Sequence, residues 1–154
     1  MSQKRILLSL LLFALVLLWS SFIFSNSMED VSASYETSAR FIRLIDSRLL
    51  EDPDTYILAQ NFFRKAAHFF EFFMLGILFY FLFSRLKKPA VPAFLFSVLA
   101  AFLDEGLQMF SDRGNSLRDV ALDSCGAAVG VLLMIVFSWG FRRRKSRKQT
   151  GKHP

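Results

Sequence analysis

The sequence predicts an all-α integral membrane protein with four transmembrane helices. The 154-residue chain is 53% hydrophobic, and its mean hydropathy is +0.37 even though 21% of its residues are charged. Its apolar residues gather in four long runs, and its length allows a single domain. None of these runs alternates apolar and polar residues as the strands of a membrane β-barrel do. Helices are therefore the expected spanning elements.

The first run, residues 6–24, is uncharged and leucine-rich, and it is long enough to cross the hydrocarbon core as a helix. Lys4 and Arg5 precede it, and the small residues Ser25 and Ser27 follow it, as in a cleavable signal peptide. Its apolar part is longer than that of an ordinary signal peptide. We therefore expect a retained anchor that follows a cytoplasmic N-terminus, residues 1–5.

Residues 25–61 are expected to form an acidic outer loop. Apolar residues recur within it at helix-like spacing, which indicates a short amphipathic helix resting on the membrane surface. A solvated linker is an equally good interpretation. The residues that carry this pattern are Phe41, Ile42, Leu44, Ile45, Leu49 and Leu50.

The other spans are expected at residues 62–84, 90–110 and 117–141, which completes a membrane domain over residues 6–141 before a basic tail, 142–154. Most of the 19 lysines and arginines lie before the first span, between the second and third, and in the tail. By the positive-inside rule these segments, and hence both termini, are cytoplasmic. The tail either anchors this topology or attracts anionic lipid headgroups. It lacks the interleaved aromatic residues of a nucleic-acid surface, so no nucleic-acid partner is expected.

Six polar residues interrupt the second, third and fourth spans. Each ionised side chain costs about 2.5–3.5 kcal/mol at a helix centre, so such residues usually mark a functional site or a paired interior. At 1.5 Å per residue, one of them on each helix lies roughly 9 Å below the outer boundary. The six are His68, Glu71, Asp104, Glu105, Gln108 and Asp123, of which His68, Asp104 and Asp123 share that depth.

Helical spacing predicts which of these residues face one another. Arg64 precedes His68 by four residues and Glu71 by seven, so the three share one stripe. Asp104 and Gln108 share a stripe of the third span, and Asp119 and Asp123 share one of the fourth that continues through Gly126 and Gly130. Small residues at this spacing let another helix approach closely. The stripes are expected to converge in a pocket that opens outward only.

The connection between the third and fourth spans is expected to be a tight turn at Gly114 and Asn115. Ser116 and Asp119 fit a helix-capping pattern. Arg113 and Arg118 are placed to meet an anion, which is either a phosphate or, for Arg113, the carboxylate of Asp104 or Glu105.

Three functions fit these residues. The first is a binding site for a lipid-linked headgroup, formed by Arg64, His68, Glu71, Asp104, Glu105, Gln108, Arg113, Ser116, Asp119 and Asp123. The second is an intramembrane hydrolase or transferase that acts on a phospholipid or undecaprenyl-linked substrate. The third is a structural partner in which the polar residues hold the helices together.

Catalysis would use His68 as acid or base, with Glu71, Asp104 and Glu105 as further candidates. The carboxylates of Asp104, Glu105, Asp119 and Asp123 could alternatively hold Mg²⁺. No recognised metal spacing is present, and no G-x-S-x-G motif surrounds Ser111 or Ser116. We therefore expect no metal and no cofactor. Cys125, the single cysteine, is interpreted as a packing residue.

Three segments resemble the motifs of the VanZ-like family, which consists of small four-helix bacterial membrane proteins named after a teicoplanin-resistance protein. They are RKAAHFFEF at 64–72, DEGLQ at 104–108 and RGNSLRDVALDSCG at 113–126. The resemblance extends over the four spans. Two residues depart from the family pattern: Phe72 stands where the family often has Tyr, and Asp123 where it often has Asn.

The resemblance implies a multi-pass protein of the bacterial plasma membrane. It also implies low-level resistance to teicoplanin and related lipid-anchored glycopeptides, without remodelling of the cell-wall termini that these drugs bind. The expected partners are membrane lipids or a lipid-linked cell-wall precursor.

Overall fold

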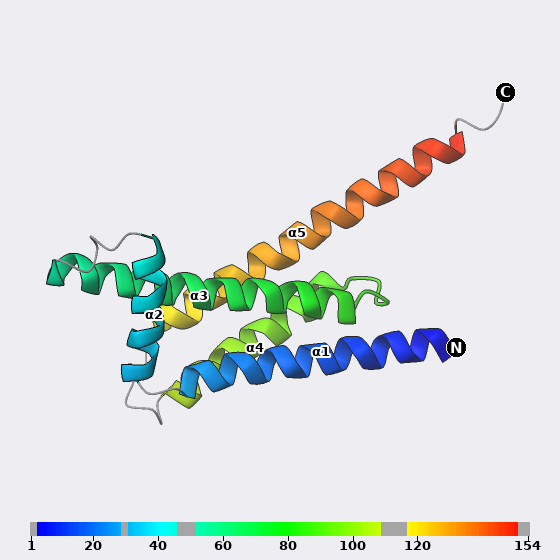
Figure 1. The fold of residues 1–154 in the computed structure, drawn as a ribbon. Coiled ribbons are helices and arrows are strands. Elements are labelled where there is room, and N and C mark those ends of the chain that lie inside the picture. The colour runs from blue at the N-terminus through cyan, green and yellow to red at the C-terminus, as the bar shows by residue number, and fades with distance from the viewer. Residues whose placement is uncertain (1–2, 29–30, 46–51, 109–116, 151–154) are drawn as a thin grey trace.

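The structure is a computed structural model that describes residues 3–28, 31–45, 52–108 and 117–150. Every regular element within these ranges is a helix (Figure 1). The helices are α1 (Gln3–Met28), α2 (Val31–Ile45), α3 (Pro53–Leu82), α4 (Ala90–Gln108) and α5 (Leu117–Thr150).

Four of these helices are long and apolar enough to cross a membrane, namely α1, α3, α4 and the Leu117–Phe141 part of α5. Large apolar side chains also cover their outer surfaces. Leu18 of α1 is 69% exposed and Val136 of α5 is 64% exposed. Such a surface would be unfavourable in water over this area, and it is the surface that lipid tails cover. The predicted fold class, a four-helix membrane protein, is confirmed.

Helix α3 begins at Pro53, whereas the apolar run predicts a helix from residue 62. Asp52 caps this start, because its side chain accepts hydrogen bonds from the Thr55 amide at 3.0 Å and from the Thr55 hydroxyl at 2.6 Å. Proline at the first helical position has a φ angle that suits a helix. These two local signals start the helix outside the apolar run, so a prediction based on hydropathy placed the start too late.

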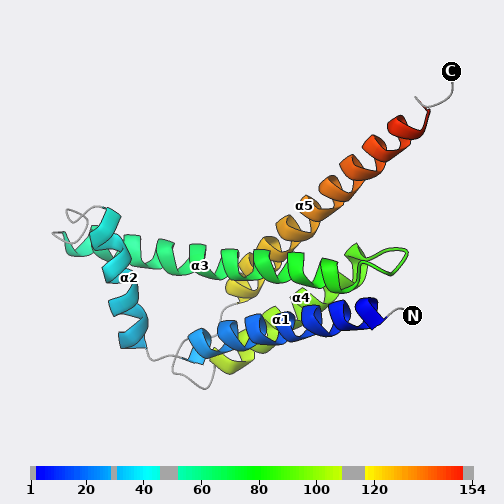
Figure 2. The same ribbon diagram turned by 45° about the vertical axis from the view of Figure 1, so that its right-hand side comes forward.

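Most of the described part of the expected outer loop is also helical. Helix α1 continues to Met28, and α2 confirms the amphipathic helix rather than the linker, although it lies earlier in the chain than the apolar pattern suggested. In α2, Ile42 is fully buried while Leu44 is 83% exposed. Leu49 and Leu50 lie outside the described residues. Figures 1 and 2 show α2 running across the bundle next to α3, with which it is in contact.

Helix α5 also continues beyond its expected end, from residue 141 to Thr150, so most of the basic tail is helical. Lysine and arginine favour helices, and no proline interrupts this stretch. Arg143 lies over the ring of Trp139, 3.6 Å from the ring centroid. An aromatic ring with a cation on its face is typical of the membrane–water interface.

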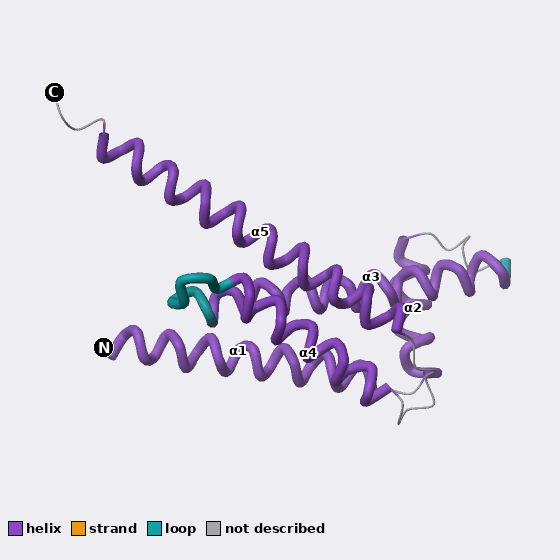
Figure 3. The backbone as a smooth tube through the Cα atoms, turned by 180° about the vertical axis from the view of Figure 1, so that it is seen from behind, coloured by secondary structure: helices purple, strands orange, loops and turns teal. Residues whose placement is uncertain are grey.

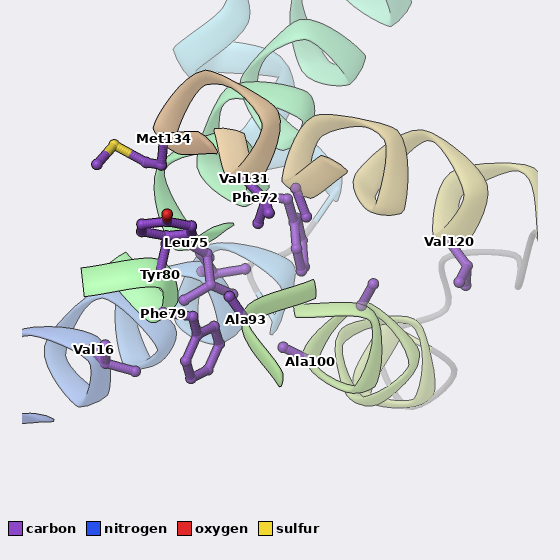
Figure 4. Packing of buried hydrophobic residues seen from close by; sticks show 13 residues of the cluster. Val16, Phe72, Leu75, Phe79, Tyr80, Ala93, Ala100, Val120, Val131 and Met134 are labelled. Atoms are coloured by element: carbon purple, nitrogen blue, oxygen red, sulfur yellow. The ribbon is translucent and has the colours of Figure 1, made fainter. Parts of the chain in front are cut away.

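The core lies where α3 packs against α5, with α4 and α1 completing the bundle. Figure 4 shows Phe72, Leu75 and Phe79 of α3 meeting Ala93 of α4 and Val131 of α5. Glycines allow the closest approaches. A Cβ atom at Gly76 would lie 2.6 Å from the backbone oxygen of Ala127, and Cβ atoms at Gly126 and Gly130 would overlap the backbone oxygens of Phe69 and Phe73. The predicted close approach at Gly126 and Gly130 is confirmed.

The first turns of α1, the α3–α4 connection and the last turns of α5 lie towards the same end of the molecule (Figures 1 and 3). The α3–α4 connection is tied to α1 there, because Arg85 donates a hydrogen bond to the backbone oxygen of Arg5 at 2.5 Å. This arrangement agrees with placing all three basic segments on one side of a membrane. Which side that is stays a prediction from the charge distribution.

Candidate functional site

The buried polar residues of the three later spans meet at one point in the bundle. His68 of α3, Asp104 of α4 and Asp123 of α5 each offer one nitrogen or carboxylate oxygen, and these atoms all lie within 4.8 Å of one another. Asp104 is fully buried, and Asp123 is 3% exposed. The convergence that helical spacing and depth predicted is therefore present. We call His68, Asp104 and Asp123 the triad.

Helical geometry explains how three separate helices reach one point. Asp104 lies in the last turns of α4 and Asp123 in the second turn of α5, so the two helices meet near the ends that residues 109–116 connect. The close backbone approach of Gly126 to Phe69 brings the first turns of α5 against the middle of α3, beside His68. Small residues at the α3–α5 contact therefore position the triad as well as the helices.

Neighbouring polar side chains hold the triad residues in place. Gln108 donates a hydrogen bond to Oδ2 of Asp104 at 2.9 Å from one turn further along α4. Glu71 places Oε2 3.4 Å from Nδ1 of His68, close enough for an ion pair but without the angles of a hydrogen bond. The other oxygen of Glu71 accepts a hydrogen bond from Asn26 of α1 at 2.9 Å.

The arrangement leaves several buried atoms without hydrogen bonds. Within the described part of the chain, Nδ1 of His68, Oε2 of Glu71, Oδ1 of Asp104 and Oδ1 of Asp123 have no hydrogen-bond partner. Buried polar atoms are almost always paired in proteins, and each exception calls for an explanation such as a bound water, ion or ligand. A cluster of unpaired polar atoms on facing helices is the arrangement expected of a binding site.

Helix α1 also contributes to this region, although the polar residues of the later spans alone did not indicate it. Besides the hydrogen bond from Asn26, Trp19 donates its indole N–H to the backbone oxygen of Glu71 at 3.0 Å. Ser27, fully buried, interacts with Asp104. The position of Asn26 and Ser27 could have identified them, because polar side chains at the C-terminal end of α1 reach the level of the polar residues in the other spans.

The remaining predicted residues lie around the triad. Glu105 is buried beside Asp104, and Arg64 is partly buried one turn before His68 on α3. Asp119, one turn before Asp123, faces Lys65 of α3 at 3.7 Å. Arg118 is exposed in the first turn of α5. Arg113 and Ser116 lie outside the described residues, so the structure does not place them.

Asp104 and Asp123 are buried among the helices, whereas His68 is partly exposed. Residues 109–116, which follow α4, lie outside the described ranges, so the expected outward pocket stays a prediction. Two hollows among the described residues lie near the start of α4. One, of about 380 Å³, is an apolar groove between α4 and α5, lined by residues such as Phe94 and Val131. The other, of about 430 Å³, adjoins it and includes Lys88, Tyr80 and Ser138. Neither contains a triad residue.

The fold and this site define a four-helix membrane protein with a polar cluster buried among its spans. The family model described as VanZ/LLP1 matches residues 6–138, which is nearly the whole chain. The chain therefore belongs to the VanZ-like family. Searches of curated proteins and of solved structures give no match.

Proposed function

We propose that this protein binds the polar headgroup of a lipid-linked molecule of the bacterial plasma membrane. The observation that carries the proposal is the convergence of the triad below a group of cations. Arg64 lies one turn before His68 on α3, Lys65 follows it and is exposed, and Arg118 is exposed in the first turn of α5. Cations at this position suit a phosphate, and buried carboxylates suit amines or sugar hydroxyls.

The membrane setting favours a lipid-linked ligand over a soluble one. The outer surfaces of all four spans are apolar. A ligand that reaches the cluster from the lipid, by passing between helices, must therefore have an apolar part as well as a polar headgroup. A lipid-linked cell-wall precursor or a phospholipid has both parts, and so does a lipid-anchored glycopeptide. The proposal therefore includes the low-level teicoplanin resistance that the family resemblance implies.

Lipid retention by the purified protein tests this proposal. The wild type, purified in mild detergent, should carry a specific phospholipid or lipid-linked precursor that native mass spectrometry identifies. Arg64→Gln combined with Arg118→Gln should reduce its retention at least tenfold. Lys87→Gln, which removes an exposed cation from the α3–α4 connection, should retain the wild-type amount. Equal retention by all three proteins, or no specific lipid on the wild type, would contradict the proposal.

An intramembrane enzyme is the second candidate, and the observation that favours it is the contact between Glu71 and His68. A carboxylate next to an imidazole can orient it as a general acid or base, and the buried oxygens of Asp104 and Asp123 lie close by. If the retained lipid is converted over time by the wild type, and His68→Gln binds it without conversion, the protein is an enzyme. Binding without turnover by the wild type favours the first candidate.

A further inference from the structure

We propose that His68, Asp104 and Asp123 bind a divalent transition-metal cation, of the class represented by Zn²⁺ and Mn²⁺. This inference goes beyond headgroup binding and does not depend on it. It starts from distance: one ligand atom from each residue lies within 4.8 Å of the others. Two ligands of a single tetrahedral Zn²⁺, each bound at about 2.1 Å, lie about 3.4 Å apart. The three side chains therefore need to approach one another by at most about 1.4 Å to bind one ion.

The unpaired atoms provide a second, independent observation. Oδ1 of Asp104 and Oδ1 of Asp123 are buried and have no hydrogen-bond partner within the described ranges, and both side chains are more than nine-tenths buried. Oδ2 of Asp104 is already taken by Gln108. Gln108 and Ser27 thus hold the carboxylate in place, while Oδ1 makes no hydrogen bond of good geometry within the described ranges, which is how the second shell of a metal site orients a ligand.

The negative charge of the two aspartates provides a third argument for a bound cation. Two ionised carboxylates at this depth require a compensating positive charge. Among the described residues, no lysine or arginine forms an ion pair with Asp104 or Asp123, and Lys65 pairs with Asp119 instead. The carboxyl groups of Glu71 and Glu105 are buried next to the triad as well. A divalent cation therefore offsets more of the negative charge of this region than a lysine or a single proton would.

The donor set selects the class of metal. One imidazole and two carboxylates suit Zn²⁺ or Mn²⁺, whereas Ca²⁺ and Mg²⁺ prefer oxygen ligands throughout. Glu71, with Oε2 at 3.4 Å from the imidazole of His68, is placed either to orient that ring or to complete the coordination. Three protein ligands also leave a coordination position that a phosphate or water oxygen can occupy.

Metal content and metal titration test the proposal on the full-length protein in detergent, without a polyhistidine tag. After treatment with a chelator, the wild type should take up about one Zn²⁺ or Mn²⁺ per chain, measured by mass spectrometry of the metal. Asp104→Asn and Asp123→Asn should each lower the affinity by at least about 100-fold, a larger loss than removal of a second-shell group causes. Asp54→Asn, an exposed carboxylate at the start of α3, should bind like the wild type.

A spectroscopic measurement on the wild type keeps the proposal testable if the aspartate variants do not fold. Co²⁺ added to the chelator-treated wild type should give the visible absorption of a low-symmetry nitrogen and oxygen site, and Zn²⁺ should displace it. Absence of both stoichiometric uptake and a Co²⁺ spectrum would overturn the inference. It would also be overturned if Asp104→Asn and Asp123→Asn bound as tightly as Asp54→Asn. Neither outcome depends on whether a lipid is retained, so this test fails or succeeds separately from that of the proposed function.

Discussion

At the scale of single residues, polar side chains in this protein act according to whether the structure pairs them. Asn26 and Gln108 each satisfy one oxygen of a buried carboxylate, Glu71 and Asp104 respectively, and leave the other oxygen unpaired. Asp52 represents the opposite case, since it is exposed and its side chain accepts two hydrogen bonds from Thr55. The unfavourable unpaired oxygens therefore lie among the membrane-spanning helices. The paired side chain of Asp52, in contrast, orders the start of α3.

The helix start provides a prediction on pH. The hydrogen bonds from Thr55 hold the pKa of Asp52 below its usual value. Because the pKa of Asp52 is lower in the folded state, the cap stabilises the first turn of α3 fully above about pH 4, which is the pKa of Asp in the unfolded chain. This contribution is lost as the pH falls through the lower pKa of the folded state. Hydrogen exchange corrected for intrinsic rates should show reduced protection of the first turn in Asp52→Ala at pH 7.

The same experiment contains its own check. Wild-type protection of that turn should approach the level of Asp52→Ala in acid below about pH 4. Asp54→Ala, which alters a neighbouring carboxylate of the same turn, should keep wild-type protection at neutral pH because Asp52 still caps the helix. A variant whose first turn is as well protected as the wild type at pH 7 would show that the cap does not hold the helix start.

At the scale of helices, α3 and α5 form the contact on which the rest of the bundle depends. Gly76 faces Ala127, and Gly126 and Gly130 face backbone atoms of Phe69 and Phe73, so the two backbones touch. Close approach gains dispersion energy and brings His68 to Asp123. Near the other end of the contact, the Tyr80 hydroxyl donates a hydrogen bond to Ser138 at 3.1 Å. The contact is thus fixed on both sides of its centre.

Substitution of a single glycine should test this contact. Gly126→Ala places a methyl group against the Phe69 backbone, so the helices must separate, and we expect a loss of about 1–3 kcal/mol in the free energy of unfolding. Gly140→Ala lies on the same helix in open space, where alanine favours the helix by about 0.5–1 kcal/mol. Reversible unfolding in mixed micelles measures both. A stability of Gly126→Ala equal to that of Gly140→Ala would be inconsistent with backbone contact at this position.

At the scale of the whole molecule, the described helices form a bundle with two different ends. The first turns of α1, the α3–α4 connection and the last turns of α5 gather at one end, where the basic residues are concentrated. The opposite end has α2 and the acidic start of α3. The triad lies closer to this second end, because it involves the last turns of α4 and the first turns of α5.

This asymmetry predicts how the protein is oriented. We expect the basic end to be cytoplasmic and the α2 end to be outside. In a Cys125→Ser background, Glu36→Cys on α2 should react with a membrane-impermeant maleimide in intact cells. Ser84→Cys in the α3–α4 connection should react only after the membrane is permeabilised. The reverse pattern of labelling would show that the protein is inverted.

The hydropathy of each segment was sufficient to predict most of the helices. Four apolar runs identify four spans because burial in lipid is a property of each segment by itself. The starts and ends were less accurate: a polar cap at Asp52 and helix-forming basic residues after Phe141 extend helices beyond their apolar parts. Hydropathy describes where a chain meets lipid, and a helix can continue into water.

The sequence by itself determined that polar residues occupy three spans at a common depth, because helical rise and spacing are fixed by the backbone. Only the tertiary structure decided that His68, Asp104 and Asp123 come within bonding reach of one ion, and that α1 joins them through Asn26 and Trp19. A metal motif within one segment can be recognised from its spacing, whereas these ligands come from three helices. Their approach depends on how each helix is rotated and how closely it packs, which the contacts between the helices determine.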